Sequence, residues 1–161
     1  YLLIYLRSLV VIGWASIIFG FILFFADKNF KSEKKWEELK LFEIIIVGFF
    51  QVLAFIPGAS RAGVTITGAR FLKIKRDSAA IFSMLLSIPI IIASLLLALL
   101  DIVNSGGGNI NFIQSIIASI VAFITSITSI HLMMKILKFT NFNLFIIYRI
   151  ILGIALLVFY A

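Results

Sequence analysis

The stretch PGASRAGVTITGAR, residues 57–70, gathers residue types that bind anions within an otherwise apolar chain. Glycines at positions 58 and 63 let backbone N–H groups approach a ligand closely, as they do in loops that bind phosphate. Arg61 carries a permanent charge, and its planar guanidinium matches the spacing of phosphate oxygens. Gly58, Arg61 and Gly63 together therefore indicate an anion-binding loop.

Two hydroxyl groups and a predicted helix start strengthen this interpretation. Ser60 and Thr65 place hydroxyls beside Arg61. A half-helix that starts near Val64 would direct its positive N-terminus at the same place. The structural alternative is a helix break capped by Ser60 and Thr65, with Arg61 paired to an acidic residue elsewhere.

The composition defines the surroundings of this loop. Of the 161 residues, 63% are hydrophobic and only 13% are charged, with a mean hydropathy of +1.20. Soluble domains are about half apolar and one-quarter charged. The net charge of +7 does not indicate a nucleic-acid partner, because most lysines and arginines lie in short connections, where the positive-inside rule places them. The absence of cysteine excludes disulfides and thiolate metal sites.

The apolar runs predict an all-α, polytopic integral membrane protein forming a single membrane domain. A helix-loop-helix segment is expected at 41–74. Its first apolar run, 41–56, would extend about 24 Å, which is short of the roughly 30 Å hydrocarbon core. We expect four spanning helices, at residues 2–26, 77–100, 112–134 and 144–161.

The positive charges favour a re-entrant hairpin over a crossing at 41–74. If the chain enters and leaves on one side, the basic segments 27–40 and 70–76 share that side with Lys135 and Lys138. The lysine-free glycine linker then lies on the opposite side, and Arg7 is the one exception. By the positive-inside rule, the basic side is cytoplasmic.

At these residues the chain resembles a known family. PGASRAGVTITG, preceded by Gln51 in FFQVLAFIPG, is similar to the second signature of the undecaprenyl-diphosphate phosphatases, the bacitracin-resistance family. The usual form of that signature is PG-x-SRSG-x-T. The similarity continues through SAAIFSMLLSIPIIIASLLLAL and FNLFIIYRIILGIALLVFY. Ala62 is a departure, because the family more often has serine there.

The resemblance implies a multi-pass phosphatase of the bacterial inner membrane, built from two inverted repeats. It would remove the terminal phosphate of a polyprenyl diphosphate lipid, recycling undecaprenyl phosphate for cell-wall synthesis, with a divalent cation, Mg²⁺ or Ca²⁺, as cofactor. A homodimer is possible, and no nucleic-acid partner is expected. The residues expected to bind or process the diphosphate are Ser60, Arg61 and Thr65, with Gly58, Ala59, Gly63 and Gln51 lining the substrate site.

The family's other signature, EFLP-x-SSTGH, is absent from these residues. Its glutamates, serines and histidine are the usual candidates for metal binding, nucleophilic attack and acid-base work. The chain is therefore predicted to be the C-terminal portion of the enzyme and to supply no metal ligand itself.

Four other polar residues suit ordinary structural roles. His131 is expected at the membrane interface or packed rather than catalytic. Glu43 fits the interface near the lysines better than a partnership with the site. For Arg149, snorkelling back to the cytoplasmic surface is favoured over a role facing the cavity, and Asp77 is expected to lie at a helix start. For Gln51, a role beside the loop and a role in helix packing are equally supported.

A different class of function remains open on the residues alone. Half-helices that point at an anion near the membrane midplane also mark inverted-repeat transporters, and a channel of that kind is similar. A structural membrane partner is a third, weaker alternative.

Because the acidic signature is missing, we expect residues 1–161 alone to be inactive. Purified residues 1–161 should release no phosphate from undecaprenyl diphosphate in a colorimetric assay. Turnover above the protein-free control would contradict the assignment of the catalytic acid and base to the other signature.

Overall fold

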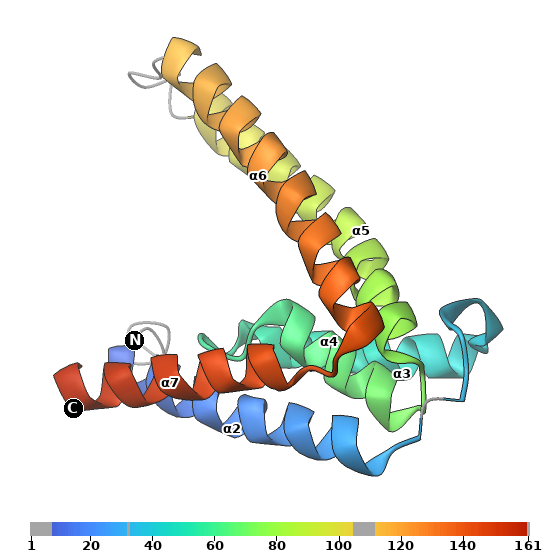
Figure 1. Ribbon diagram of the computed structural model, residues 1–161. Coiled ribbons are helices and arrows are strands. Elements are labelled where there is room, and N and C mark those ends of the chain that lie inside the picture. The colour runs from blue at the N-terminus through green and yellow to red at the C-terminus, as the bar shows by residue number, and fades with distance from the viewer. Residues whose placement is uncertain (1–7, 32, 105–111, 161) are drawn as a thin grey trace. The chain divides into compact units, whose positions relative to one another are not determined.

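The computed structural model describes residues 8–31, 33–104 and 112–160, and within them the chain is helical (Figure 1). The prediction of an all-α polytopic membrane protein is confirmed, since four helices are long and apolar enough to cross a membrane. The α-helices are α2 (Leu9–Asn29), α3 (Leu41–Val52), α4 (Arg61–Phe71), α5 (Arg76–Asn104), α6 (Phe112–Phe139) and α7 (Asn143–Tyr160). Two 3-10 turns, η1 (Trp36–Glu38) and η2 (Leu53–Phe55), flank α3.

The helix bounds differ from the predicted ones mainly at their ends. Residues 1–7 of the expected span 2–26, with Arg7, lie outside the described residues, as does the linker 105–111. At its other end that span continues into the polar connection as far as Asn29. The prediction that α4 begins near Val64 is wrong by three residues, because Ser60 caps the helix and lets it begin at Arg61.

The chain divides into two compact units. One contains α6 and the part of α5 from Leu85 onward, and its apolar side chains are largely exposed. Exposed apolar surface of this extent is expected of helices that face lipid rather than water. The other unit contains α2, α3, α4, the start of α5 and α7, and it holds the buried core.

In the unit that holds the buried core, α2 packs closely against α7 (Figure 1). The helices meet where glycines leave room, as is common between membrane helices. A Cβ atom added to Gly153 would lie 2.7 Å from the carbonyl oxygen of Gly13 and 2.6 Å from Ile17. Further along, Gly20 faces Ile150 and Ile146. This register makes the two helices antiparallel.

The helix-loop-helix segment forms a hairpin whose two ends meet. α3 packs on α4, with Gly68 against the ring of Phe50. At the base, backbone N–H groups of Glu33 and Lys34 donate to the carbonyl of Lys73, at 2.9 and 3.2 Å, and Lys75 donates to Lys34 at 2.9 Å. The two basic segments therefore lie together, as the re-entrant prediction requires.

A buried ion pair holds the base of the hairpin to α2. Arg70, the last basic residue of α4, is 1% exposed, and its Nε lies 3.0 Å from the carboxylate of Asp27. The guanidinium also donates to the carbonyl oxygens of Asp27, Phe30 and Ile74. Arg76 donates to the same carboxylate from Nε, at 2.9 and 3.1 Å. Asp27 thus neutralises two arginines at one point.

Replacing Asp27 with alanine should destabilise the protein by about 3–5 kcal/mol, because it leaves Arg70 buried without its carboxylate. Glu33→Ala is the matched control, since it removes a carboxylate from the half-exposed pair with Lys73 and should cost at most about 1 kcal/mol. Thermal unfolding of the detergent-solubilised protein measures both. Equal shifts in Tm for the two variants would refute the structural role of Asp27.

Candidate functional site

The loop between η2 and α4 packs against α2 through the backbone of Gly58. Gly58 has a φ of +91°, and a Cβ there would lie 2.5 Å from the carbonyl oxygen of Ile12. Only glycine fits this position. The hydroxyl of Ser16, also on α2, lies 3.3 Å from the Gly58 carbonyl oxygen and donates to it. The tip of the hairpin is therefore built into the helix pair and is not a free surface loop.

The first turn of α4 begins at this tip. Ser60 is the N-cap residue, and its Oγ accepts a hydrogen bond from the N–H of Gly63 at 3.3 Å. Its φ of 64° is unusual for a residue with a side chain and carries strain, a feature that concentrates at ligand sites. Arg61 follows as the first helical residue and is partly exposed. A permanent charge and a helix N-terminus thus coincide, as the sequence predicts.

A second arginine reaches the loop from α7. Arg149 is only 9% exposed, so the prediction that it snorkels to the surface is wrong. Its Nη2 donates to the carbonyl oxygens of Gly58 and Ala59, at 2.9 and 2.7 Å. Its Nη1 is buried without a hydrogen-bond partner and lies directly beside Gly63. The loop carbonyls thus accept from the guanidinium within the protein.

The charge of Arg149 has no counterion within the described residues. The ion pairs there join lysines or the arginines at the hairpin base to Asp27, Glu33 and Glu43. A buried guanidinium without a carboxylate is costly unless an anion or dipoles compensate it. The unfilled Nη1 donor beside the first turn of α4 therefore marks a place suited to an anion.

The hydroxyl of Thr65 is directed into the protein interior. Thr65 is 1% exposed, its Oγ1 lies 2.6 Å from the hydroxyl of Ser83 on α5, and it donates to the carbonyl of Arg61 at 2.9 Å. This arrangement fixes α4 against the start of α5. Direct contact of Thr65 with a diphosphate stays a prediction.

Comparison with known proteins assigns the chain to a family. The family model described as "Bacitracin resistance protein BacA" matches residues 2–155. The chain belongs to this family. BacA family membership agrees with the resemblance carried by PGASRAGVTITG and with the helical membrane fold.

Three curated relatives of this chain share one functional name. Proteins named "Undecaprenyl-diphosphatase" from Jannaschia sp. (strain CCS1) and Ruegeria pomeroyi are each 40% identical to it, over 153 and 152 residues. A third with that name, from Chromohalobacter salexigens, is 38% identical over 157 residues. The matches cover 94–98% of this chain and 57–59% of the three relatives. The chain thus spans less than two-thirds of their length.

The remaining predicted site residues are distributed as follows. Ala59 is fully buried at the loop, and Ala62, the departure from the signature that the loop resembles, is exposed. Gln51 lies on α3, with its Oε1 buried and without a hydrogen-bond partner among the described residues. No hydrogen bond joins it to the loop in that part of the chain, so its role in substrate binding stays a prediction.

Two other polar residues, Glu43 and His131, are predicted to have structural roles. Glu43 lies 2.7 Å from Lys34 Nζ and accepts from the backbone N–H of Lys40 at 3.0 Å, which caps α3. The hydrogen bond to Glu43 raises the pKa of Lys34, which lies outside the spanning helices. Glu43 thus pairs with a lysine, as expected, and its place at the membrane interface stays a prediction. His131 is exposed on α6, in the other unit.

The described residues contain no group of three or more His, Cys, Asp or Glu side chains able to hold a metal ion. Mg²⁺ and Ca²⁺ favour carboxylate and carbonyl oxygens. The loop offers cationic and hydroxyl groups, and the carbonyls of Gly58 and Ala59 already accept from Arg149. The loop itself does not fit a divalent cation.

Two residues of the site were missed or misread from sequence, namely Ser83 and Arg149. Ser83 sits in an apolar run where a serine carries no signal of its own. Arg149 lies well inside the last apolar run, and an intramembrane charge is by default a candidate functional residue. Sequence alone favours snorkelling over a role facing the cavity for this residue, and its contacts with the loop carbonyls reverse that order.

Gly63→Ala should weaken anion binding by at least about tenfold while preserving the fold. The added Cβ displaces the Arg149 guanidinium, whereas alanine favours the helix. The measurement is the rise in Tm that inorganic pyrophosphate gives to the full-length protein. Gly48→Ala, which meets nothing within 4 Å, is the control. A pyrophosphate-dependent rise equal to that of the control would show that Arg149 does not bind the anion.

Proposed function

We propose that the protein containing this chain hydrolyses undecaprenyl diphosphate to undecaprenyl phosphate and inorganic phosphate. The relatives named above support this, because each is called an undecaprenyl-diphosphatase. The chain itself contributes the re-entrant hairpin and its arginine-lined tip. This portion binds the diphosphate and stabilises its charge.

The observation that carries the proposal is the buried Nη1 donor of Arg149. Arg149 has no carboxylate partner within the described residues, and its Nη2 is already bound to the loop carbonyls. A phosphate oxygen beside Gly63 would accept from Nη1 and compensate the charge. A neutral substrate would leave the charge of Arg149 without a counterion.

Arg61 and the first turn of α4 supply the second part of the anion site. Hydrolysis breaks the anhydride P–O bond, and negative charge builds up on the leaving lipid phosphate and on the phosphoryl oxygens. Cationic groups and helix N-termini aimed at those oxygens lower the barrier because they are already oriented. We assign Arg61 to the phosphoryl oxygens and the Ser60 hydroxyl to orienting one of them.

Thr65 and Ser83 act one step away from the substrate in this scheme. Their buried hydroxyl contact holds α4 at the depth where its first turn meets the loop. We therefore assign them as positioning residues. Gly58, Ala59 and Gly63 provide the backbone surface on which the diphosphate rests.

The divalent cation implied by the resemblance, Mg²⁺ or Ca²⁺, is assigned to ligands outside the loop, because the loop lacks carboxylates. When bound, it would neutralise diphosphate charge that the two arginines leave uncompensated. The lipid substrate fits the apolar exterior of the helices. We place the protein in the bacterial inner membrane, in the recycling of the carrier lipid for the cell wall, and a homodimer stays a prediction that light scattering can measure.

The transporter or channel alternative is not carried forward. Its basis was the half-helix geometry, which a phosphatase site shares. The relatives named above are phosphatases by name.

Arg61→Ala in the full-length protein should lower kcat/KM for undecaprenyl diphosphate by about 100- to 1,000-fold, the usual loss when one oriented charge-stabilising donor is removed. Its Tm should stay near that of the parent protein. Lys73→Ala is the matched control, because it removes a half-exposed cation from the hairpin base and should retain turnover. Phosphate release measures both, and unchanged turnover in Arg61→Ala would overturn the assignment.

A further inference from the structure

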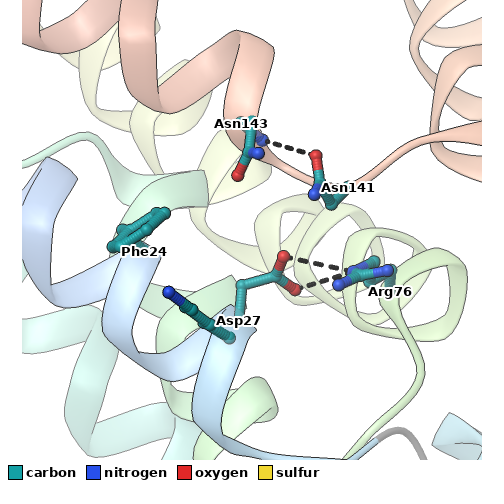
Figure 2. A pocket seen from close by; sticks show the side chains of 6 residues that line it. Phe24, Asp27, Arg76, Asn141 and Asn143 are labelled. Atoms are coloured by element: carbon teal, nitrogen blue, oxygen red, sulfur yellow. Dashed lines mark hydrogen bonds and ion pairs between the residues drawn. The ribbon is translucent and has the colours of Figure 1, made fainter.

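A cavity lies at the opposite end of the helix pair from the loop. It has a volume of about 320 Å³, within the usual range for ligand pockets. It opens where α2 ends and α7 begins, beside the first residue of α5 (Figure 2). Its lining comprises Phe24, Asp27, Lys28, Arg76, Asn141 and Asn143.

This cavity is separate from the candidate functional site. The loop contacts α2 at Ser16, whereas the cavity begins at Phe24 and Asp27. At the helical rise of about 1.5 Å per residue, Ser16 and Asp27 are roughly 16 Å apart along the axis. A diphosphate bound at the hairpin tip would not occupy both places.

The cavity is lined by more positive than negative charge. The Asp27 carboxylate is shared by buried Arg70 and by Arg76, as Figure 2 shows for Arg76. Arg76 bonds to it through Nε, which leaves the N–H donors of its terminal nitrogens for another acceptor. Lys28 adds a further cation, with Nζ 5.6 Å from the ring centroid of Phe24. The cavity is therefore suited to an anion.

The amides on the α7 side provide neutral donors. Asn141 lies just before α7, and its Oδ1 accepts from the backbone N–H of Asn143 at 3.3 Å. This contact occupies the amide oxygen and leaves the Nδ2 group as a donor. Asn143 is the first residue of α7, so the helix N-terminus borders the same space.

An apolar groove continues from the cavity. It has a volume of about 210 Å³ and is lined by Phe21, Phe24, Asn143, Ile146, Ile147 and Ile150. Phe24 and Asn143 line both spaces, so the two adjoin. The groove follows the seam between α2 and α7, two helices apolar enough to cross the membrane. A ligand that fills both spaces carries an anionic group and a hydrocarbon chain.

The location agrees with a ligand drawn from the bilayer. The cavity adjoins the basic connection 27–40 and the start of α5, on the side where the positive-inside rule places the cytoplasm. Basic pockets between membrane helices on that side bind the headgroups of anionic lipids. A free anion such as inorganic phosphate would leave the apolar groove unused.

We propose that this cavity binds the phosphate of an anionic phospholipid of the surrounding bilayer, with one acyl chain along the α2–α7 groove. The phosphate lies between Lys28, Arg76 and the amides of Asn141 and Asn143. The bound lipid then joins the ends of α2 and α7 at the membrane surface. This site is independent of the proposed phosphatase activity.

The test is native mass spectrometry of the full-length protein with phosphatidylglycerol or phosphatidylcholine of identical acyl chains. Phosphatidylglycerol should bind at least about fivefold more tightly, the effect of about one basic residue near the membrane surface. Lys28→Gln should remove most of this preference. Lys31→Gln is the matched control, because it removes an exposed lysine of the same connection that does not line the cavity.

Two further variants test the cavity and the groove separately. Asn143→Asp adds a negative charge inside the cavity but favours a helix N-terminus, so it should abolish the preference without lowering Tm. Ile147→Trp, at a position 55% exposed, should fill the groove and weaken binding of phosphatidylglycerol. Millimolar inorganic phosphate should fail to displace the lipid.

Three results would overturn the proposal. One is equal affinity of the parent protein for the two lipids. Another is an equal loss of preference in Lys28→Gln and Lys31→Gln, which would indicate diffuse surface charge. The last is displacement by inorganic phosphate together with unchanged binding in Ile147→Trp, which would indicate an anion site without a lipid chain.

Discussion

A buried guanidinium needs acceptors, and in this chain backbone carbonyls provide them at both ends of the hairpin. At the tip, Arg149 donates to the carbonyls of Gly58 and Ala59, where the chain is not helical. At the base, Arg70 donates to the carbonyl of Asp27 in the last turn of α2 and to those of Phe30 and Ile74, which lie beyond helix ends. Non-helical backbone within a membrane must itself find partners. The two requirements satisfy each other, and the hairpin is thereby fixed to α2 and α7.

The two arginines differ in their counterions, and this difference separates structure from function. Arg70 has the carboxylate of Asp27, so its charge is neutralised within the protein. Arg149 has no carboxylate partner among the described residues and keeps one buried donor unfilled. A charge balanced internally stabilises a fold, whereas a charge left open is prepared for a ligand. The hairpin tip is therefore where the proposed chemistry belongs.

Much of the architecture could be predicted because it depends on local patterns. Long apolar runs predicted where the four long helices lie, with differences at their ends, and Pro57 with Gly58 marked the break that forms the hairpin tip. The positive-inside rule correctly paired the basic segments 27–40 and 70–76, which meet through backbone hydrogen bonds. Such features need no knowledge of which helices pack together.

The unpredicted parts depend on contacts between distant segments. Asp27 and Arg70 each lie in charge-rich stretches that the positive-inside rule already explains, so nothing in the sequence marked them as a buried pair. Arg149 reaches the loop only because α7 runs antiparallel to α2 with glycines at their contact. The inverted-repeat origin expected from the resemblance stays a prediction. Sequence thus identified one half of the arginine pair at the tip, Arg61, and packing supplied the other.

The hairpin tip is fixed mainly through its backbone, and this affects which substitutions it can accept. Arg149 donates to carbonyl oxygens, and Gly58 contacts the backbone of Ile12. Because these contacts use main-chain atoms of the loop, they would persist under many side-chain substitutions in it. Ala62 is exposed at the start of α4, where the signature that this loop resembles has serine. An alanine or a serine there leaves the main-chain framework unchanged. Side-chain substitutions can therefore change the chemistry of this loop without changing its position.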